Sequence, residues 1–192
     1  MSFVLRDLGI TIGRMPPGKT NTITDVPGVA VGHTTLIEGD NIRTGVTAII
    51  PHAGNLFYEK VHAASVTING YGKAIGFPQI NELGTIETPI LLTNTLNVGK
   101  VSDALISWVI EKHGIPDCDI HSVNPVVAEC NDSYLNDIRA RAIEKKHVFG
   151  VLDSASSEPV EEGVMGAGVG MSAFEFKSEI GSASRTISLD GK

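Results

Sequence analysis

The sequence predicts a mixed α+β domain, and three observations support this fold class. Two apolar segments, 29–36 and 43–50, flank the polar turn 38–41, which is the pattern of a β-hairpin. Residues 98–113 carry apolar side chains at helical spacing, and the apolar run 123–128 is typical of a buried strand. Because strands are followed both by a hairpin turn and by a helix, the pattern favours α+β over a regular βαβ series.

The other predicted elements lie around the helix at 98–113, which a Gly-Ile-Pro sequence ends. The segment 87–95 before that helix reads as a short buried strand that ends in polar residues. Alternating apolar residues predict a further strand at 61–69, and a second helix is predicted at 135–146. No internal repeat is present.

Length and composition indicate one globular domain that covers residues 1–192. The chain is 42% hydrophobic and 19% charged, which excludes a disordered protein. The formal net charge of −7 argues against nucleic acid as a partner, because phosphate binding needs a basic surface. The first residues lack the pattern of a signal peptide, and no apolar run reaches the roughly 20 residues of a membrane helix. We therefore expect a cytoplasmic protein without a membrane partner.

No complete catalytic or metal-binding motif is present in the sequence. None of the six histidines forms an HxH or HExxH pattern, so each is expected in a loop or on the surface. Cys118 and Cys130 match no zinc or redox spacing and are expected to be reduced, buried or half-buried thiols. A pairing of Cys130 with His121 as thiol and base is the alternative to simple packing. We expect neither a metal nor a cofactor.

Three glycine-containing segments near the C-terminus receive structural interpretations. The segment 163–172 contains a GxGxG pattern, but no strand with an acidic residue follows at the distance of a dinucleotide-binding fingerprint, so close backbone packing is predicted. Cleavage at Gly181-Ser182, a bond type that some self-processing hydrolases cut, would leave only eleven residues, and an ordinary loop is predicted there. The final Asp190-Gly191 is a hairpin-turn signal with no return strand after it.

The most informative stretch for function is 127–137. Glu129 comes near the carboxyl end of the predicted strand, and polar residues fill the turn behind it. Ligands gather at such turns in mixed folds, because the core fixes the backbone while the side chains stay accessible. Asp132 or Ser133 is interpreted as the cap of the following helix. Capping leaves Glu129 unexplained, which makes Glu129 a candidate binding residue.

Five parts of the chain carry motifs that occur together in one family. They are 21–29 with 31–35, 43–48, 86–95 with 98–99, 127–137, and 164–170 with 181–185. In this order they resemble the DmpA-type aminopeptidases, which comprise the self-processing L-aminopeptidase/D-Ala-esterases and the β-peptidyl aminopeptidases. The resemblance covers nearly the whole chain.

The resemblance implies a four-layer αββα sandwich shared with the ornithine acetyltransferases, represented here by most of the larger amino-terminal subunit. In this family the precursor cuts its own Gly-Ser bond, and the freed serine acts as nucleophile with its α-amine as base. An asparagine supplies part of the oxyanion hole. Both residues lie, in the family, beyond the point that matches Lys192. We therefore expect this chain to be inactive without the carboxyl-terminal subunit of the same precursor.

The resemblance also suggests roles for individual residues. Glu129 matches the acid that binds the free amino group of the substrate, and a carboxylate in a partly desolvated pocket attracts an ammonium group strongly. Tyr134 would be a catalytic helper near the scissile carbonyl or a wall of the pocket, and Asn131 is a further candidate for substrate binding. Ser133 stands where a glycine is expected, and Lys73 stands where many relatives are expected to have an acid.

The leading functional hypothesis is an aminopeptidase or amidase for small peptides, amides or esters, assembled as a homo-oligomer of processed pairs. Two alternatives stay open. One is an acyltransferase of the ornithine acetyltransferase type, which uses a threonine nucleophile. The other is a non-catalytic relative that kept the fold and lost the active serine. The first residue after the processing site would separate the two enzyme classes.

Overall fold

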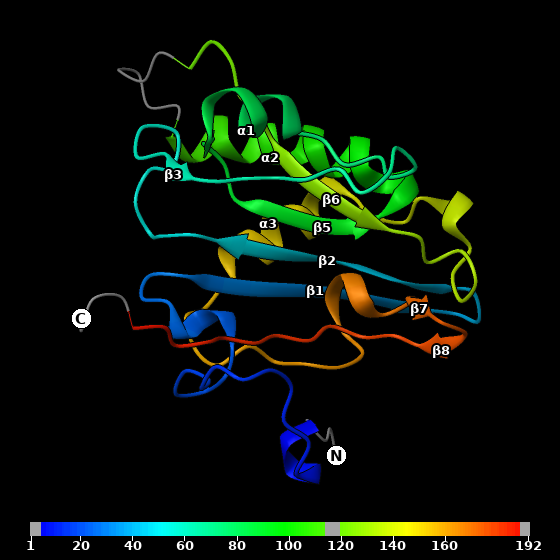
Figure 1. Ribbon diagram of the computed structural model, residues 1–192. Helices are drawn as coiled ribbons and strands as arrows, with labels where there is room; N and C mark the ends of the chain where they lie inside the picture. The colour runs from blue at the N-terminus through cyan, green and yellow to red at the C-terminus, as the bar shows by residue number, and fades with distance from the viewer. Residues whose placement is uncertain (1–4, 114–119, 189–192) are drawn as a thin grey trace.

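The protein is organised around one four-stranded sheet with the strand order β1-β2-β5-β6 (Figure 1). The computed structural model describes residues 5–113 and 120–188. β1 and β2 pair antiparallel over their whole length, so the predicted hairpin is confirmed, and β5 pairs antiparallel with β2 and parallel with β6. The strands are β1 (Ala30–Glu38), β2 (Ile42–Ile50), β5 (Ile90–Asn94) and β6 (Val126–Cys130).

Two helices, α2 (Val98–His113) and α3 (Lys145–Asp153), cover one face of the sheet (Figure 1). α2 has the predicted bounds, because its apolar residues fall on the side that packs against the strands. It also forms the crossover connection that allows β5 and β6 to run parallel. The buried core between these layers consists of Leu36, Val46, Ala48, Leu91, Val98, Val101, Ala104, Leu105, Trp108, Val109, Val127, Ile143, Val148, Val151 and Leu152.

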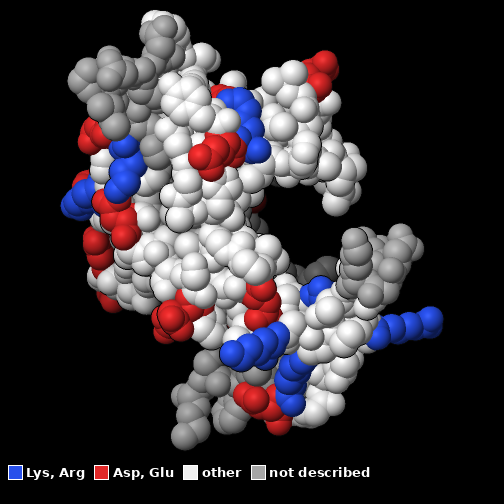
Figure 2. All heavy atoms as spheres, turned by 90° about the vertical axis from the view of Figure 1, so that its left-hand side faces the viewer, with Lys and Arg blue, Asp and Glu red and all other residues white. Residues whose placement is uncertain are grey.

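The opposite face of the sheet is only partly covered. Helix α1 (Phe77–Leu83) packs with the short strands β3 (Val61–His62) and β4 (Thr85–Ile86) over Ile90 and Val126. The rest of this face carries side chains that stay half-buried, and the space-filling view shows a deep hollow on this side (Figure 2). We call this region the open face; its strand residues Val31, Ile49 and Leu92 line a cavity of about 200 Å³, which Val160 and residues 180–183 also line.

The glycine-dense segment packs closely against the strands, as predicted. It contains the 3-10 helix η5 (Gly166–Gly168), and a Cβ at Gly45 of β2 would lie 2.2 Å from the Gly166 carbonyl oxygen. A Cβ at Gly170 would lie 2.1 Å from the Arg43 carbonyl oxygen. These distances exclude any larger residue, so the glycines allow backbone to approach backbone. The hairpin of β7 (Ser172–Ala173) and β8 (Phe176–Lys177) follows.

The edge of the open face near the N-terminal segment is held by polar contacts. The Asp25 carboxylate accepts hydrogen bonds from the Thr20 amide at 2.9 Å and from the Ser184 hydroxyl at 2.6 Å. The Ser182 hydroxyl accepts from the Ile23 amide at 2.8 Å. The Ser184–Asp25 and Ser182–Ile23 contacts each join residues that are 159 positions apart, and they fix the segment 182–184 beside the segment 23–25.

Two predicted elements are wrong. The strand expected at 61–69 is limited to β3, because only Val61 and His62 find a partner strand and the exposed fractions of Val66 and Ile68 are 80% and 91%. The helix expected at 135–146 is a 3-10 turn, η4 (Ile138–Ala140), after which Arg141 has a φ of 45° and breaks any helical path. Helices α1 and α3 were not predicted.

The cysteine and histidine expectations also need correction. Cys130 is exposed rather than buried or half-buried, because it is the last residue of β6. His33 lies half-buried in β1 instead of in a loop or on the surface. Cys118 and the Asp190-Gly191 turn signal lie outside the described residues. Among the residues that the structure describes, no helix combines the length and apolar character needed to cross a membrane.

Candidate functional site

The candidate site lies at the edge of the sheet where the parallel strands β5 and β6 both end. Glu129 is the fourth residue of β6 and pairs in register with Thr93 of β5. Because the two strands run in the same direction, the residues that follow β5 and those that follow β6 arrive at the same edge. This topology brings Thr95, directly after β5, to the carboxylate of Glu129.

The Glu129 carboxylate is half-buried and held by two hydrogen-bond donors. The Thr95 hydroxyl donates to its Oε2 atom, and the main-chain amide of Lys73 donates to its Oε1 atom at 3.1 Å. The Lys73 ammonium group lies 4.0 Å from the centre of the Tyr71 ring and donates to the Tyr71 carbonyl. Each carboxylate oxygen therefore has one donor from the protein.

Glu129 lines a cavity of about 220 Å³ between the ends of β5 and β6 and the segment 167–180. The walls are mostly apolar, which strengthens the attraction between the carboxylate and a cation. An ionised carboxylate accepts about four hydrogen bonds, so two donors from the protein leave lone pairs for a ligand. The other lining residues are Leu92, Thr93, Ala128, Cys130, Ala167, Gly168, Met171, Ser178, Glu179 and Ile180.

The chemistry of this cavity suits an organic cation better than a metal ion. Within the described ranges, no group of three or more His, Cys, Asp or Glu side chains is arranged to hold a metal. A primary ammonium group carries three N–H donors and one positive charge, which matches the free lone pairs and the negative charge of Glu129.

A buried polar network lies behind the candidate site. The carboxylate of Asp132, whose exposed fraction is 1%, accepts hydrogen bonds from the amide of Asn94 at 3.0 Å and from the amide of Asn136 at 3.1 Å. Asn94 also donates to the Thr44 hydroxyl, and its oxygen accepts from the Asn97 main chain at 3.1 Å. The network thus joins the turns after β5 and β6 to the start of α2.

The network corrects the interpretation of Asp132 or Ser133 as a helix cap. No α-helix begins at these residues, and the Asp132 side chain binds across the fold to Asn94 instead. Ser133 donates its main-chain amide to the side-chain oxygen of Asn131 at 2.9 Å, which closes the turn locally. Sequence reasoning missed Asn94, although the polar end of the predicted strand at 87–95 was the signal.

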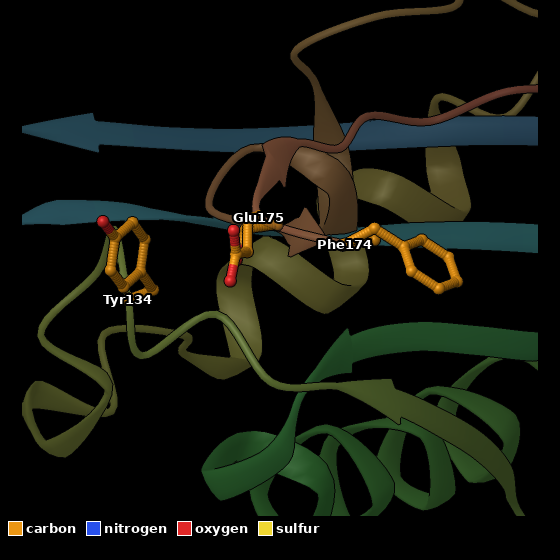
Figure 3. A pocket seen from close by; sticks show the side chains of 5 residues that line it. Tyr134, Phe174 and Glu175 are labelled. Carbon is orange, nitrogen blue, oxygen red and sulfur yellow. The ribbon is translucent and has the colours of Figure 1, made fainter.

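Asn131 and Tyr134 lie near the end of β6 but do not line the Glu129 cavity. Asn131 is exposed, and its side-chain oxygen is occupied by the Ser133 amide. Tyr134 is 85% exposed and lines a separate depression of about 470 Å³ with the tip of the β7–β8 hairpin. Figure 3 shows the Tyr134 ring and the Glu175 carboxylate facing each other across this depression, while Phe174 points away.

The tip of the β7–β8 hairpin is strained. Phe174 and Glu175 have φ angles of 52° and 67°, the left-handed region that favours glycine. The exposed fraction of Phe174 is 95%, so its side chain gains nothing from burial that would offset the strain. Strained residues of this kind gather where a protein contacts ligands or partners.

The remaining motifs have structural explanations. Gly181 and Ser182 lie in a loop, as predicted, where the Ser182 amide donates to the Glu162 carboxylate at 2.7 Å.

His33 lines the cavity of the open face, and its Nδ1 atom lies 2.9 Å from the Thr47 hydroxyl oxygen. Burial lowers the pKa of His33, which favours a neutral imidazole at physiological pH.

Comparison with known proteins identifies similar sequences and similar structures. The model of the family described as Peptidase family S58 matches residues 21–192. A curated relative, the β-peptidyl aminopeptidase BapA of Sphingosinicella xenopeptidilytica, is 43% identical over 95% of this chain and 47% of its own length. The chain therefore spans about half the length of the curated relatives that it matches.

Solved structures show the same fold. The PH0078 protein from Pyrococcus horikoshii OT3 superposes with a TM-score of 0.91 at 52% identity, over 97% of this chain and 55% of that one. The L-aminopeptidase D-Ala-esterase/amidase from Ochrobactrum anthropi superposes with a TM-score of 0.89 at 35% identity, over 98% of this chain and 54% of its own. The latter structure is described as a prototype for the serine aminopeptidases and a variant of the Ntn hydrolase fold. These likenesses confirm the predicted fold class.

Proposed function

The chain belongs to peptidase family S58, and on this premise we propose that it forms part of a self-processing serine aminopeptidase. The enzyme releases amino-terminal residues from small peptides, amides or esters. Two observations support the activity: relatives are named β-peptidyl aminopeptidase and L-aminopeptidase D-Ala-esterase/amidase, and the strand-end cavity holds an anionic group suited to an ammonium ion.

The observation that carries the proposal is the geometry of Glu129. Its carboxylate has one protein donor on each oxygen and lines a largely apolar cavity. A substrate with a free α-amino group places an ammonium ion there, and a hydrogen bond to a charged group contributes about 1.5–3 kcal/mol. A peptide bond inside a longer chain lacks this ammonium, so Glu129 restricts the enzyme to amino-terminal residues.

A carboxyl-terminal subunit of the same precursor is the proposed partner of this chain, which alone is inactive. The chain spans about half of its curated relatives, and Val31, Ile49 and Leu92 on the open face are half-buried apolar residues. A further segment that covers the open face would bury them and bring the amino-terminal serine nucleophile to the Glu129 cavity. Residues 1–192 then form a single domain with that segment.

Tyr134 and Asn131 are assigned supporting roles around the scissile bond. Met171 lines the Glu129 cavity and the next residue, Ser172, lines the depression beside Tyr134, so the two spaces are neighbours along one segment. Tyr134 has a phenolic hydroxyl that donates hydrogen bonds, which suits a catalytic helper near the scissile carbonyl. Asn131 offers its amide N–H groups to the substrate, since its oxygen is already engaged.

The proposed location rests on the amino-terminal sequence, which lacks the pattern of a signal peptide, and the proposed assembly rests on the family resemblance. The nucleophile of the enzyme forms within the precursor, and the enzyme needs neither a metal nor a cofactor. We place the enzyme in the cytoplasm as a homo-oligomer of processed pairs.

The proposal is tested with the full gene product that contains this chain. Intact-mass measurement after expression is expected to show two polypeptides, the second of which begins with serine. A second polypeptide that begins with threonine would favour an acyltransferase. The processed protein is expected to release p-nitroaniline from an aminoacyl p-nitroanilide and not from the N-acetylated form of the same compound. A processed protein without release activity would contradict the proposal.

The role of Glu129 is tested by Glu129→Gln, which removes the charge and keeps the shape. We expect KM for the aminoacyl substrate to rise about 10- to 100-fold with little change in kcat. The reason is that the lost contact binds the ground state and the transition state equally. Glu111→Gln is the matched control, since Glu111 forms an exposed ion pair with Lys145 on the helix layer. An unchanged KM in Glu129→Gln would show that Glu129 does not bind the amino group.

A further inference from the structure

We propose that Thr95 is a positioning residue that sets the orientation of the Glu129 carboxylate, and that the buried pair Asn94–Asp132 holds Thr95 in place. This inference rests on the proposed function, because the oriented carboxylate is the group that would bind the ammonium ion. Thr95 itself does not need to touch the substrate; it acts through Glu129.

The hydrogen bond between Thr95 and Glu129 has a defined direction, because the Thr95 hydroxyl donates and the Glu129 carboxylate accepts. The Thr95 hydroxyl carries a single hydrogen, and this hydrogen points to the Oε2 atom of Glu129. The Lys73 main-chain amide points its hydrogen to the Oε1 atom. Two donors on different oxygens fix the rotation of the carboxylate plane, which a single donor leaves free to turn. The remaining lone pairs then keep one direction relative to the cavity.

Thr95 is held where it can make this contact. It is the first residue of the 3-10 helix η3 (Thr95–Asn97), and the side-chain oxygen of Asn94 caps that helix by accepting from the Asn97 amide. The Asn94 amide donates to the buried carboxylate of Asp132, which lies three residues after Glu129. The turn that carries Thr95 and the turn that follows Glu129 are therefore linked by a buried hydrogen bond.

Preorganisation explains why such a link matters for binding. A carboxylate that rotates freely must lose that freedom when the ammonium ion arrives, and the loss weakens binding. Removing the Thr95 donor lets the carboxylate of Glu129 rotate. The cost of ordering it again lowers the affinity for ligands with a free amino group and leaves the affinity for ligands without it unchanged.

The experiment uses the full gene product and measures binding by calorimetry, independently of hydrolysis. The probes are an amino alcohol, which carries the free amino group but no scissile carbonyl, and the matching alcohol without the amino group, and the quantity is the ratio of their Kd values. Thr95→Val keeps the branched shape and removes the hydroxyl, and it is expected to lower this amino preference about tenfold. Thr95→Ser restores the hydroxyl and is expected to return the preference to within about twofold of wild type.

A double-mutant cycle separates positioning from general structural damage. In a Glu129→Ala background, Thr95→Val is expected to change the preference by less than about twofold, because the residue acts only through the missing carboxylate. A full tenfold effect in that background would overturn the inference. An unchanged amino preference in Thr95→Val alone would also overturn the inference. The proposed function would still stand in that case if Glu129→Ala abolished the amino preference. A wild-type protein without amino preference would overturn both.

Discussion

The two faces of the central sheet are built differently. The face under α2 and α3 is closed by apolar side chains, and Leu91 on that side is fully buried. The adjacent residue in β5, Leu92, points to the open face, where it is half-buried and lines two cavities. The closed face is a finished core, whereas the open face keeps apolar area that a finished core would bury.

The segments that border each face differ in the same way. α2 and α3 are fixed mainly by apolar burial, whereas the segments beside the open face are fixed by hydrogen bonds such as those from Ser184 to Asp25 and from the Ser182 amide to Glu162. Apolar contacts are insensitive to pH, but contacts with carboxylates are lost when the carboxylates are protonated. The difference indicates that the contacts on the closed side depend less on pH than the contacts beside the open face.

The comparison is tested most strongly by truncating the two neighbouring leucines in the full gene product. Leu91→Ala is expected to lower the free energy of unfolding by about 2–5 kcal/mol, because it creates a cavity in the closed core. Leu92→Ala is expected to cost a similar amount only if a further segment covers the open face. Urea denaturation measures both variants, and a loss below about 1 kcal/mol for Leu92→Ala would mean that this face stays exposed.

A smaller loss is expected for the polar network between the ends of β5 and β6. Asp132→Ala removes the acceptor for the Asn94 and Asn136 amides and leaves buried donors unpaired, at a cost of about 1–3 kcal/mol. Asp132→Asn keeps an acceptor oxygen and should cost less. The measurement is again the free energy of unfolding in urea, and equal stability of wild type and Asp132→Ala would show that the network is not a stabilising link.

On the open side, one substitution is expected to stabilise the protein. Phe174→Gly relieves the left-handed conformation at the hairpin tip, with an expected gain of about 1 kcal/mol and a higher melting temperature. Phe176→Gly is the matched control, because it removes another exposed aromatic side chain in the same hairpin at a residue without a positive φ. A lower melting temperature for Phe174→Gly would indicate that the aromatic ring makes stabilising contacts in the full protein.

The smallest expected effect concerns acid sensitivity beside the open face. The hydrogen bond from the Ser184 hydroxyl, followed by that from the Thr20 amide, lowers the pKa of Asp25 from 3.8 to about 2. A lowered folded-state pKa means that this contribution to stability is present above pH 3.8 and is lost as the pH falls through about 2. The stability difference between wild type and Asp25→Asn should therefore shrink over that range in acid-unfolding experiments.

A second variant checks the cause of that acid sensitivity. Ser184→Ala removes the largest contributor and brings the pKa of Asp25 back toward 3.8, so the loss of stability should be smaller and should be complete at a higher pH than in the wild-type protein. A wild-type acid profile in both Asp25→Asn and Ser184→Ala would show that the contact does not hold the segment.

Much of the sheet and one helix could be predicted from local patterns, and the failures have identifiable causes. The β1–β2 hairpin and α2 follow directly from alternation and helical spacing, because their apolar faces are long and regular. The expected helix at 135–146 fails because Asn136 uses its side chain on the Arg43 amide and on Asp132 instead. Such side-chain bonds compete with helix formation, and they depend on partners distant in sequence.

The candidate site was only partly visible in the sequence. Glu129 stood out because its carboxylate follows a buried strand and because the family resemblance gave it a role. Thr95 could not be connected with Glu129, since the two are 34 residues apart and meet only through the parallel pairing of β5 with β6. The cavity beside Glu129 also depends on the segment 167–180, whose return across the strand ends is a tertiary feature.

The position of Cys130 offers an experimental handle on the site. This thiol is exposed, adjoins Glu129 and lines the same cavity. With Cys118 replaced by serine, Cys130 is the one cysteine of residues 1–192 left for a maleimide dye to label. The fluorescence of the bound dye would then report whether a ligand occupies the cavity beside Glu129. In a separate experiment, the decrease in the labelling rate of the free thiol with ligand concentration would give ligand affinities without any turnover.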